Sequence, residues 1–394
     1  MLIGVVGKPS TGKSTFFRAS TLAEAEIANY PFTTIKPNHA VGFVRVDCVD
    51  KEFNKQCIPR AGYCVNHNRF VPVELLDVAG LVPGAHEGLG MGNKFLDDLR
   101  QADVLIHVVD VSGSTNEKGE AVQPLSYDPI KDVEFLEREL DLWFLSLVNK
   151  GWDKFAKQQS LEKKELYKAI SKQLSGLGVS EGIARTVLTN FKEDVGQWNS
   201  NDLFNLSREL RKITKPIIIA ANKVDVKGAD ENVKRIKEKF PDYKIVECSA
   251  IAELALREAA ENKLIKYLPG DDNFEVINKL DLKTEKILDY INKEIFPKYG
   301  STGIQKVLDT AVFDLLKYIA IYPGGVNNLV DSQGRVLPDC FLMKEGSTAL
   351  DFAFKLHTDF GKSFIRAINV KTRLTIGKDY KLKHKDVIEI ISGK

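Results

Sequence analysis

The sequence predicts an α/β protein with a doubly wound, mainly parallel sheet, an inserted α-helical region and a C-terminal α+β module. Three observations lead to this fold class. Short β-branched apolar runs alternate with helix-length segments in the first and third parts of the chain. Between residues 116 and 214 only the 3.6-residue apolar period of helices is visible. Residues 320–394 carry short strand-like runs around one helix-like segment.

Composition is that of a folded globular protein. The chain has 394 residues, of which 43% are hydrophobic and 28% charged, and this length favours two or three domains. We find no long apolar run and no leader-like start, so we expect a cytoplasmic protein with no membrane partner. The net charge of +2 requires any nucleic-acid partner to meet a local basic patch. Five cysteines suit reduced thiols rather than a disulfide framework.

The elements of the expected sheet follow one another along the chain. A first strand covers Leu2–Val6, and further apolar runs predict strands at His39–Cys48, Phe70–Leu76, Val104–Val111, Pro216–Ala221 and Lys244–Cys248. Helix-length segments lie between them at Ser14–Ala28, Asn93–Gln101, Asp230–Phe240 and Ile251–Tyr267. Strand and helix thus alternate as in a doubly wound sheet.

The insertion and the C-terminal part differ from the rest of the chain in their patterns of apolar residues. Helices are expected at Asp132–Lys150, Leu161–Leu174, Ser180–Phe191 and Asn201–Ile213, with aromatic residues in their core (Phe135, Trp143, Phe144, Phe155, Tyr167). After a helical segment around Ser301–Ile319, we expect strands at Val326–Val330, Val336–Leu342, Phe364–Asn369 and Val387–Ile391 and a helix at Ala349–Thr358. The predicted division is 1–115 and 215–319 for the two parts of the main domain, 116–214 for the insertion and 320–394 for the last module.

A complete phosphate-binding loop follows the first strand. It matches G-x-x-x-x-G-K-[ST] and extends over Gly7, Lys8, Pro9, Ser10, Thr11, Gly12, Lys13, Ser14 and Thr15. Glycines let backbone N–H groups curl around a phosphate, the Lys13 ammonium suits the β- and γ-phosphates, and the Ser14 hydroxyl suits Mg²⁺. The following helix directs its positive end at the same place. The loop therefore predicts a nucleotide site.

Three further motifs select among nucleotide-binding proteins. Asp77 ends a strand and can reach Mg²⁺ through water, while the N–H of Gly80 can meet the γ-phosphate. Asn222, Lys223 and Asp225 follow another strand, where the Asp225 carboxylate can accept two hydrogen bonds from guanine that adenine cannot offer. Ser249 and Ala250 then supply a final contact to the base through backbone N–H groups.

These motifs occur in the order found in GTPases, and longer segments indicate the branch. Tyr30–Asn38 and Asp77–Gly88 with Gly92–Leu96 resemble the two switch segments of Obg-like GTPases. The helical insertion and the last module resemble the YchF-type branch, whose final part is a TGS domain with a ubiquitin-like β-grasp fold. Val336–Asp339 and Gly346–Ala349 carry that second resemblance.

The resemblance implies a P-loop GTPase that hydrolyses GTP to GDP with Mg²⁺ and associates with the ribosome or RNA. Thr34 would bind Mg²⁺ together with Ser14 and Asp77, and Thr33 is the less suitable ligand. Lys13, Thr34 and Gly80 would be the catalytic residues. The best-known YchF-type members lack the N-K-x-D motif and accept ATP, so the presence of Asn222 and Asp225 favours GTP. Ser10 stands where some potassium-activated relatives have Asn, which leaves stimulation by K⁺ open.

Several alternatives stay open at this point. Leu81 occupies the place where Ras-like GTPases have a Gln that orients the attacking water, so we expect slow hydrolysis. His86 is a weaker candidate for orienting that water. An ATPase or kinase, or an RNA-binding adaptor with incidental hydrolysis, would use the same loop. Cys57, Cys64 and His67 form an incomplete zinc pattern. A basic strip in the last module suits RNA phosphates or a solvated surface equally (Lys371, Arg373, Lys378, Lys381, Lys383, Lys385). The sequence does not indicate an oligomeric state.

Overall fold

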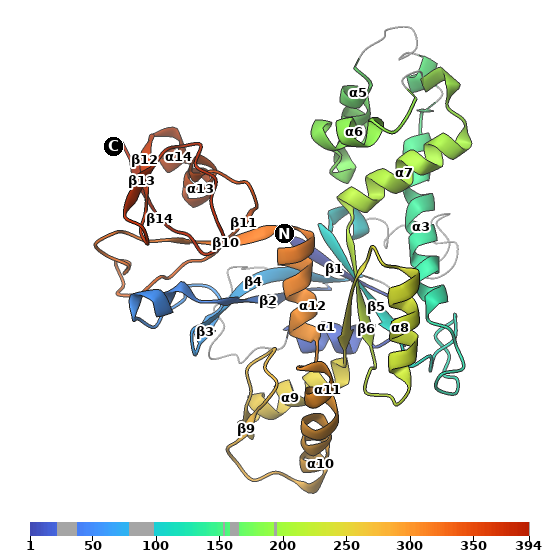
Figure 1. The fold of residues 1–394 in the computed structure, drawn as a ribbon, viewed down its shortest axis with the longest axis horizontal. Coiled ribbons are helices and arrows are strands. Elements are labelled where there is room, and N and C mark those ends of the chain that lie inside the picture. Colours follow the sequence, from blue (N-terminus) through green and yellow to red (C-terminus); the bar gives the residue numbers. More distant parts are fainter. Residues whose placement is uncertain (22–37, 79–97, 153, 158–164, 193–194, 394) are drawn as a thin grey trace.

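The computed structural model describes residues 1–21, 38–78, 98–152, 154–157, 165–192 and 195–393. Figure 1 shows a central sheet with the helical insertion on one side and a small C-terminal module on the other. Among the described residues, no helix combines the length and the apolar character that crossing a lipid bilayer requires.

Among the described residues, the central sheet has seven strands, and it confirms the expected fold class. Its order is β2-β4-β1-β5-β6-β7, with β3 paired to β4. The pairs β2–β4 and β3–β4 are antiparallel, and the other pairs are parallel. The strands are β1 (Leu2–Val6), β2 (His39–Asp47), β3 (Tyr63–Val65), β4 (Asn68–Asp77), β5 (Val104–Asp110), β6 (Ile217–Asn222) and β7 (Lys244–Cys248). The carboxyl ends of β1, β4, β5, β6 and β7 therefore meet at one edge, where ligands bind in open α/β sheets.

Helices cover both faces of this sheet. In β1, Ile3 and Val5 pack in the cluster that contains residues of α1 (Lys13–Thr21) and α12 (Ile304–Asp309). Leu2 and Val6 belong to the opposite cluster, as the alternation of side chains along a strand requires. That second face is covered by α3 (Ile130–Asn149), α7 (Ser200–Thr214) and α8 (Ala229–Lys239).

The insertion consists of helices, as predicted. α3 and α7 lead away from the sheet to α5 (Leu166–Gln173) and α6 (Glu181–Leu188) (Figure 1). Trp143 and Phe144 are buried in its core, and Phe135, Phe155 and Tyr167 pack against them as partly buried residues. The prediction that these aromatic side chains are core residues is confirmed.

The segment after β7 differs from its prediction. α9 spans only Ala250–Glu261, because Lys263 adopts a left-handed conformation (φ 58°) that ends the helix. The strand pair β8 (Ile265–Lys266) and β9 (Glu275–Val276) follows, then α10 (Leu282–Tyr290), the π-helical turn η5 (Ile291–Ile295) and α11 (Phe296–Tyr299). After α12 comes the π-helical turn η6 (Thr310–Leu315).

The C-terminal module is a five-stranded sheet of order β11-β10-β14-β12-β13 with two helices. Its elements are β10 (Tyr318–Pro323), β11 (Phe341–Lys344), α13 (Ala349–Leu356), α14 (Thr358–Lys362), β12 (Phe364–Asn369), β13 (Leu374–Ile376) and β14 (Val387–Ser392). The predicted strand at 326–330 was wrong: Val330 makes only an isolated bridge to Val336. β10 was missed because a short apolar run at the end of a helical segment does not reveal its own type.

The module contacts the loop between β2 and β3. The backbone N–H groups of Ile58 and Arg60 donate to the carbonyls of Val336 and Pro338, at 2.9 and 2.8 Å. Arg69, on β4, is 1% exposed and donates to the carbonyl of Leu337 at 3.0 Å and to that of Pro338 at 2.9 Å. Paired backbone groups and a buried guanidinium thus join the module to the main domain.

Gly303 provides a test of this packing. It precedes α12 with φ +84°, and a Cβ there would lie 2.0 Å from the carbonyl oxygen of Glu247. We expect Gly303→Ala to lower the free energy of unfolding by roughly 2–4 kcal/mol through backbone strain and overpacking. Gly300→Ala is the matched control, since Gly300 also has positive φ (+73°) but nothing within 4 Å of a Cβ. If the denaturation curves of the two variants shift equally, the close packing described at Gly303 is contradicted.

Candidate nucleotide-binding site

The phosphate-binding loop joins β1 to α1 in a conformation that needs its glycines. Gly12 has φ +90°, and a Cβ there would lie 2.4 Å from Nδ2 of Asn222. A Cβ on Gly7 would lie 2.7 Å from the carbonyl oxygen of Val108. Ser10 also adopts a left-handed conformation (φ 62°). The loop is therefore enclosed by β5 and β6, which fixes its curvature.

Lys8 lies beneath the loop. Its Nζ is 2.8 Å from a carboxylate oxygen of Asp132 on α3, 2.9 Å from the carbonyl of Thr115 and 3.9 Å from the ring centre of Tyr127. Burial raises the pKa of Asp132, although the bonds from Lys8 and Tyr127 oppose this shift. A contact between Lys8 and a phosphate would consequently have to come from its backbone.

Lys13 and Asp77 come together at the start of α1, and Ser14 is the next residue of that helix. Lys13 forms an ion pair with Asp77 across the junction of β1 and β4, and Ser14 is exposed in the first turn of the helix. A hydroxyl and a carboxylate are oxygen ligands of the kind that Mg²⁺ prefers. The residues present therefore fit the expected metal.

Asn222 joins the two halves of the site. At the end of β6, its Nδ2 donates to the carbonyl of Thr11 at 2.8 Å, and its Oδ1 accepts from the N–H of Ala250 at 2.9 Å. The side chain is 2% exposed. One amide therefore sets the position of the phosphate-binding loop relative to the start of α9.

Lys223 crosses the phosphate-binding loop and ends on Asp110. Its Nζ lies 3.0 Å from the carbonyl of Ser10 and 2.8 Å from the carboxylate of Asp110 at the end of β5. Burial by itself raises the pKa of Asp110, yet the bonds from Lys223, Ser112 and Thr115 bring that pKa below its ordinary value. We did not predict Asp110, although an acidic residue at the carboxyl end of a parallel strand was a usable signal.

Asp225 is held in place by Ser249. The Ser249 hydroxyl donates to Oδ1 of Asp225 at 2.6 Å and also caps α9 by accepting from Ala252 N–H. Tyr290 and Tyr299 donate to the backbone carbonyls of Asp225 and Val224, at 2.7 and 3.2 Å. The two tyrosines come from α10 and α11, and nothing in the local sequence marked them.

Thr34 and Gly80 lie outside the described residues, as do Leu81 and His86. The first of the two segments that contain them nevertheless ends beside the point where the second begins. The N–H of Asp77 donates to the carbonyl of Asn38 at 2.8 Å, and that of Val78 donates to the carbonyl of Val5 at 3.1 Å. The end of the first segment and the start of the second therefore lie side by side, at the start of β2 and the end of β4.

Comparisons with known proteins agree with this arrangement. Family models match a 50S ribosome-binding GTPase at residues 2–137, the G4 motif-containing domain of YGR210-like Obg-like GTPases at 220–326 and a TGS domain at 330–392. A GTP-binding protein of Methanocaldococcus jannaschii is 48% identical over 100% of this chain and 99% of its own.

This chain belongs to the Obg-like GTPases. The Bacillus subtilis protein named ribosome-binding ATPase YchF is 31% identical, with 98% of this chain and 97% of that protein covered. The crystal structure of a GTP-binding protein from Pyrococcus horikoshii aligns over 100% of both chains with 41% identity and a TM-score of 0.78. This Obg-like chain has a P-loop GTPase domain and a C-terminal TGS domain, as the sequence predicted.

Proposed function

We propose that this Obg-like GTPase binds GTP in preference to ATP. The observation that carries the proposal is the Asp225 carboxylate, fixed by the Ser249 hydroxyl and by the hydrogen bond of Tyr290 to its backbone. An oriented carboxylate beside the loop accepts from the N1–H and the amino group of guanine. Adenine offers no such pair of donors, so the carboxylate would lose its partners.

We further propose slow hydrolysis to GDP and phosphate, supported by Mg²⁺. Ser14, Thr34 and Asp77 would hold the metal, which supplies charge neutralisation for the phosphates. Lys13 would stabilise negative charge on the phosphates, and the N–H of Gly80 would donate to the γ-phosphate. Leu81 offers no polar atom to orient water, so this chain needs help from a partner, from His86 or from a bound K⁺.

We also propose a switch role, and the points where the segments of Thr34 and Gly80 attach support it. The end of the first segment and the start of the second meet at the hydrogen bond from the Asp77 N–H to the Asn38 carbonyl, and Asp77 pairs with Lys13. Both segments would lose contacts when the γ-phosphate leaves, so one chemical event changes two neighbouring parts of the surface.

Ribosome or RNA association is proposed from the basic strip and from the names of relatives. The Bacillus subtilis relative is named a ribosome-binding ATPase. In this chain Lys371 pairs with Glu52 and Lys385 with Asp47 of the main domain, whereas Lys378 and Lys383 are exposed. The exposed lysines favour phosphate contacts. We propose the same division into 1–115, 116–214, 215–319 and 320–394, and a cytoplasmic location.

Asp225→Asn tests the choice of base. Losing two hydrogen bonds to a charged acceptor removes about 1.5–3 kcal/mol each, so we expect GTP affinity to fall about a hundredfold or more. Relative acceptance of xanthosine nucleotides should improve, because xanthine carries a carbonyl in place of the amino group. Calorimetry with GTP, XTP and ATP measures this. Glu231→Gln, exposed in the first turn of α8, is the control, and equal ATP and GTP affinity in the wild type would refute the proposal.

Thr34→Ala tests the catalytic assignment against its neighbour Thr33→Ala. Single-turnover phosphate release should slow roughly ten- to a hundredfold in Thr34→Ala, through loss of contacts to a charged group. Thr33→Ala should stay near the wild-type rate, and GDP affinity should be unchanged in both. Equal slowing in the two variants would contradict the assignment.

Point variants test ribosome association better than removal of residues 320–394, which would deprive Arg69 of its carbonyl partners. The double variant Lys378→Glu and Lys383→Glu should weaken co-sedimentation with ribosomes and lower the salt slope of binding by about 2. Lys362→Glu, exposed at the end of α14, is the control. If ribosome binding and its salt dependence are unchanged, the basic strip is not part of the ribosome interface.

A further inference from the structure

We propose that Cys48, Asp50, Cys57 and Cys64 form a structural binding site for one Zn²⁺ ion, called here the thiol cluster. These residues come from the segment between the end of β2 and β3, remote from the carboxyl edge where nucleotide binding is proposed. The proposal is therefore independent of the proposed function.

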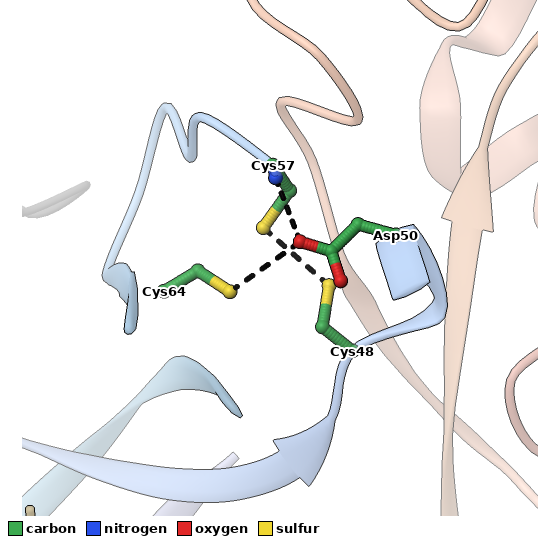
Figure 2. A group of neighbouring side chains, drawn as sticks. All are labelled: Cys48, Asp50, Cys57 and Cys64. Atoms are coloured by element: carbon green, nitrogen blue, oxygen red, sulfur yellow. Dashed lines mark hydrogen bonds between the residues drawn. The ribbon is translucent and has the colours of Figure 1, made fainter. Parts of the chain in front are cut away.

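The ligand atoms already lie at distances suited to a tetrahedral ion. The three sulfurs and one carboxylate oxygen are all within 4.8 Å of one another, and Figure 2 shows them pointing toward a common centre. Sγ of Cys48 is 3.4 Å from Sγ of Cys57, and Sγ of Cys64 is 3.9 Å from Oδ2 of Asp50. Tetrahedral zinc with Zn–S bonds of about 2.3 Å separates its sulfurs by ~3.8 Å. Only small side-chain adjustments are needed.

Asp50 is oriented by the backbone of Cys57 and by His67, which lies outside the cluster. Its side chain is fully buried; Oδ2 accepts from the N–H of Cys57 at 2.7 Å, and Oδ1 lies 3.0 Å from Nδ1 of His67. Hydrogen bonds of this kind to a ligating carboxylate are typical of metal sites. His67 thus orients the Asp50 carboxylate and is not itself a ligand. Cys48 and Asp50 supply the two ligands that were missing from the zinc pattern of Cys57 and Cys64 in the sequence.

The charge of Arg69 favours thiolates in the cluster. Nη1 of this buried guanidinium lies 3.6 Å from Sγ of Cys57, and in the described part of the chain no carboxylate forms an ion pair with it. Burying an unpaired charge costs several kcal/mol. A zinc-bound thiolate at Cys57 would place negative charge next to Arg69, whereas neutral thiols or a Cys48–Cys57 disulfide would not.

The ligand types and burial favour zinc in a closed, structural site. Three sulfurs and one oxygen suit Zn²⁺ better than Mg²⁺ or Ca²⁺, which prefer oxygen alone. Cys48, Asp50 and Cys57 are buried and Cys64 is half-buried, so no position is left open for a substrate. The same segment holds the TGS domain through Ile58 and Arg60, and zinc would therefore stabilise this docking.

Metal analysis of the full-length protein, purified without a histidine tag and dialysed against a weak chelator, tests the proposal. We expect about one zinc per chain in the wild type and in Cys340→Ser, whose half-buried cysteine lies near the same interface but outside the cluster. Cys57→Ser and Cys64→Ser should lose the metal. Retention of stoichiometric zinc by both cluster variants would overturn the assignment.

A second measurement does not depend on how the variants fold. Stripped wild-type protein is titrated with Co²⁺ alone, and we expect thiolate-to-cobalt charge-transfer bands with tetrahedral d–d absorption that Zn²⁺ displaces. Zinc should also protect three of the five thiols from a thiol reagent and raise the melting temperature. An octahedral cobalt spectrum without thiolate bands, or a metal-free protein with a Cys48–Cys57 disulfide, would refute the proposal.

Discussion

The candidate nucleotide site depends on the side-chain amide of Asn222. Its two hydrogen bonds, to the Thr11 carbonyl and the Ala250 N–H, connect loops more than two hundred residues apart in the chain. Because the amide is buried, loss of either bond would leave an unsatisfied polar group. Lys223 and Asp110 add a second connection across the same loop. The residues proposed to bind the phosphates and those proposed to bind the base are thus connected by hydrogen bonds into one unit.

Local sequence signals predicted residues at the end of their own strand, such as Asp77 and Asn222, but did not lead us to Asp110. Regular alternation predicted the main strands, and the fixed spacing of Gly7 to Ser14 predicted the phosphate-binding loop. Contacts over long separations were not predictable: the burial of Lys8 depends on Asp132, and the support of Asp225 depends on Tyr290. These partners have no distinctive neighbours in sequence. β10 was missed because its pairing with β11 and β14, rather than local periodicity, decides its conformation.

The interface of the TGS domain also depends on contacts between residues that are far apart in the chain. The module offers backbone carbonyls of Leu337 and Pro338, and the main domain offers the buried Arg69. Carbonyl dipoles solvate a guanidinium but do not neutralise it, so the charge remains to be balanced from the other side. The thiol cluster lies on that side. Domain docking and the chemistry of the cysteines are therefore electrostatically connected through one arginine.

The pair formed by Lys8 and Asp132 has a consequence for anyone who wishes to isolate the nucleotide domain. Both side chains are about 5% exposed or less, so excising the helical insertion together with α3 would remove the carboxylate that pairs with Lys8 and would open the underside of the loop to water. A minimal domain has to retain α3 through Asp132. Although α3 is the first helix of the insertion, it supports the phosphate-binding loop from below and belongs physically to the nucleotide domain.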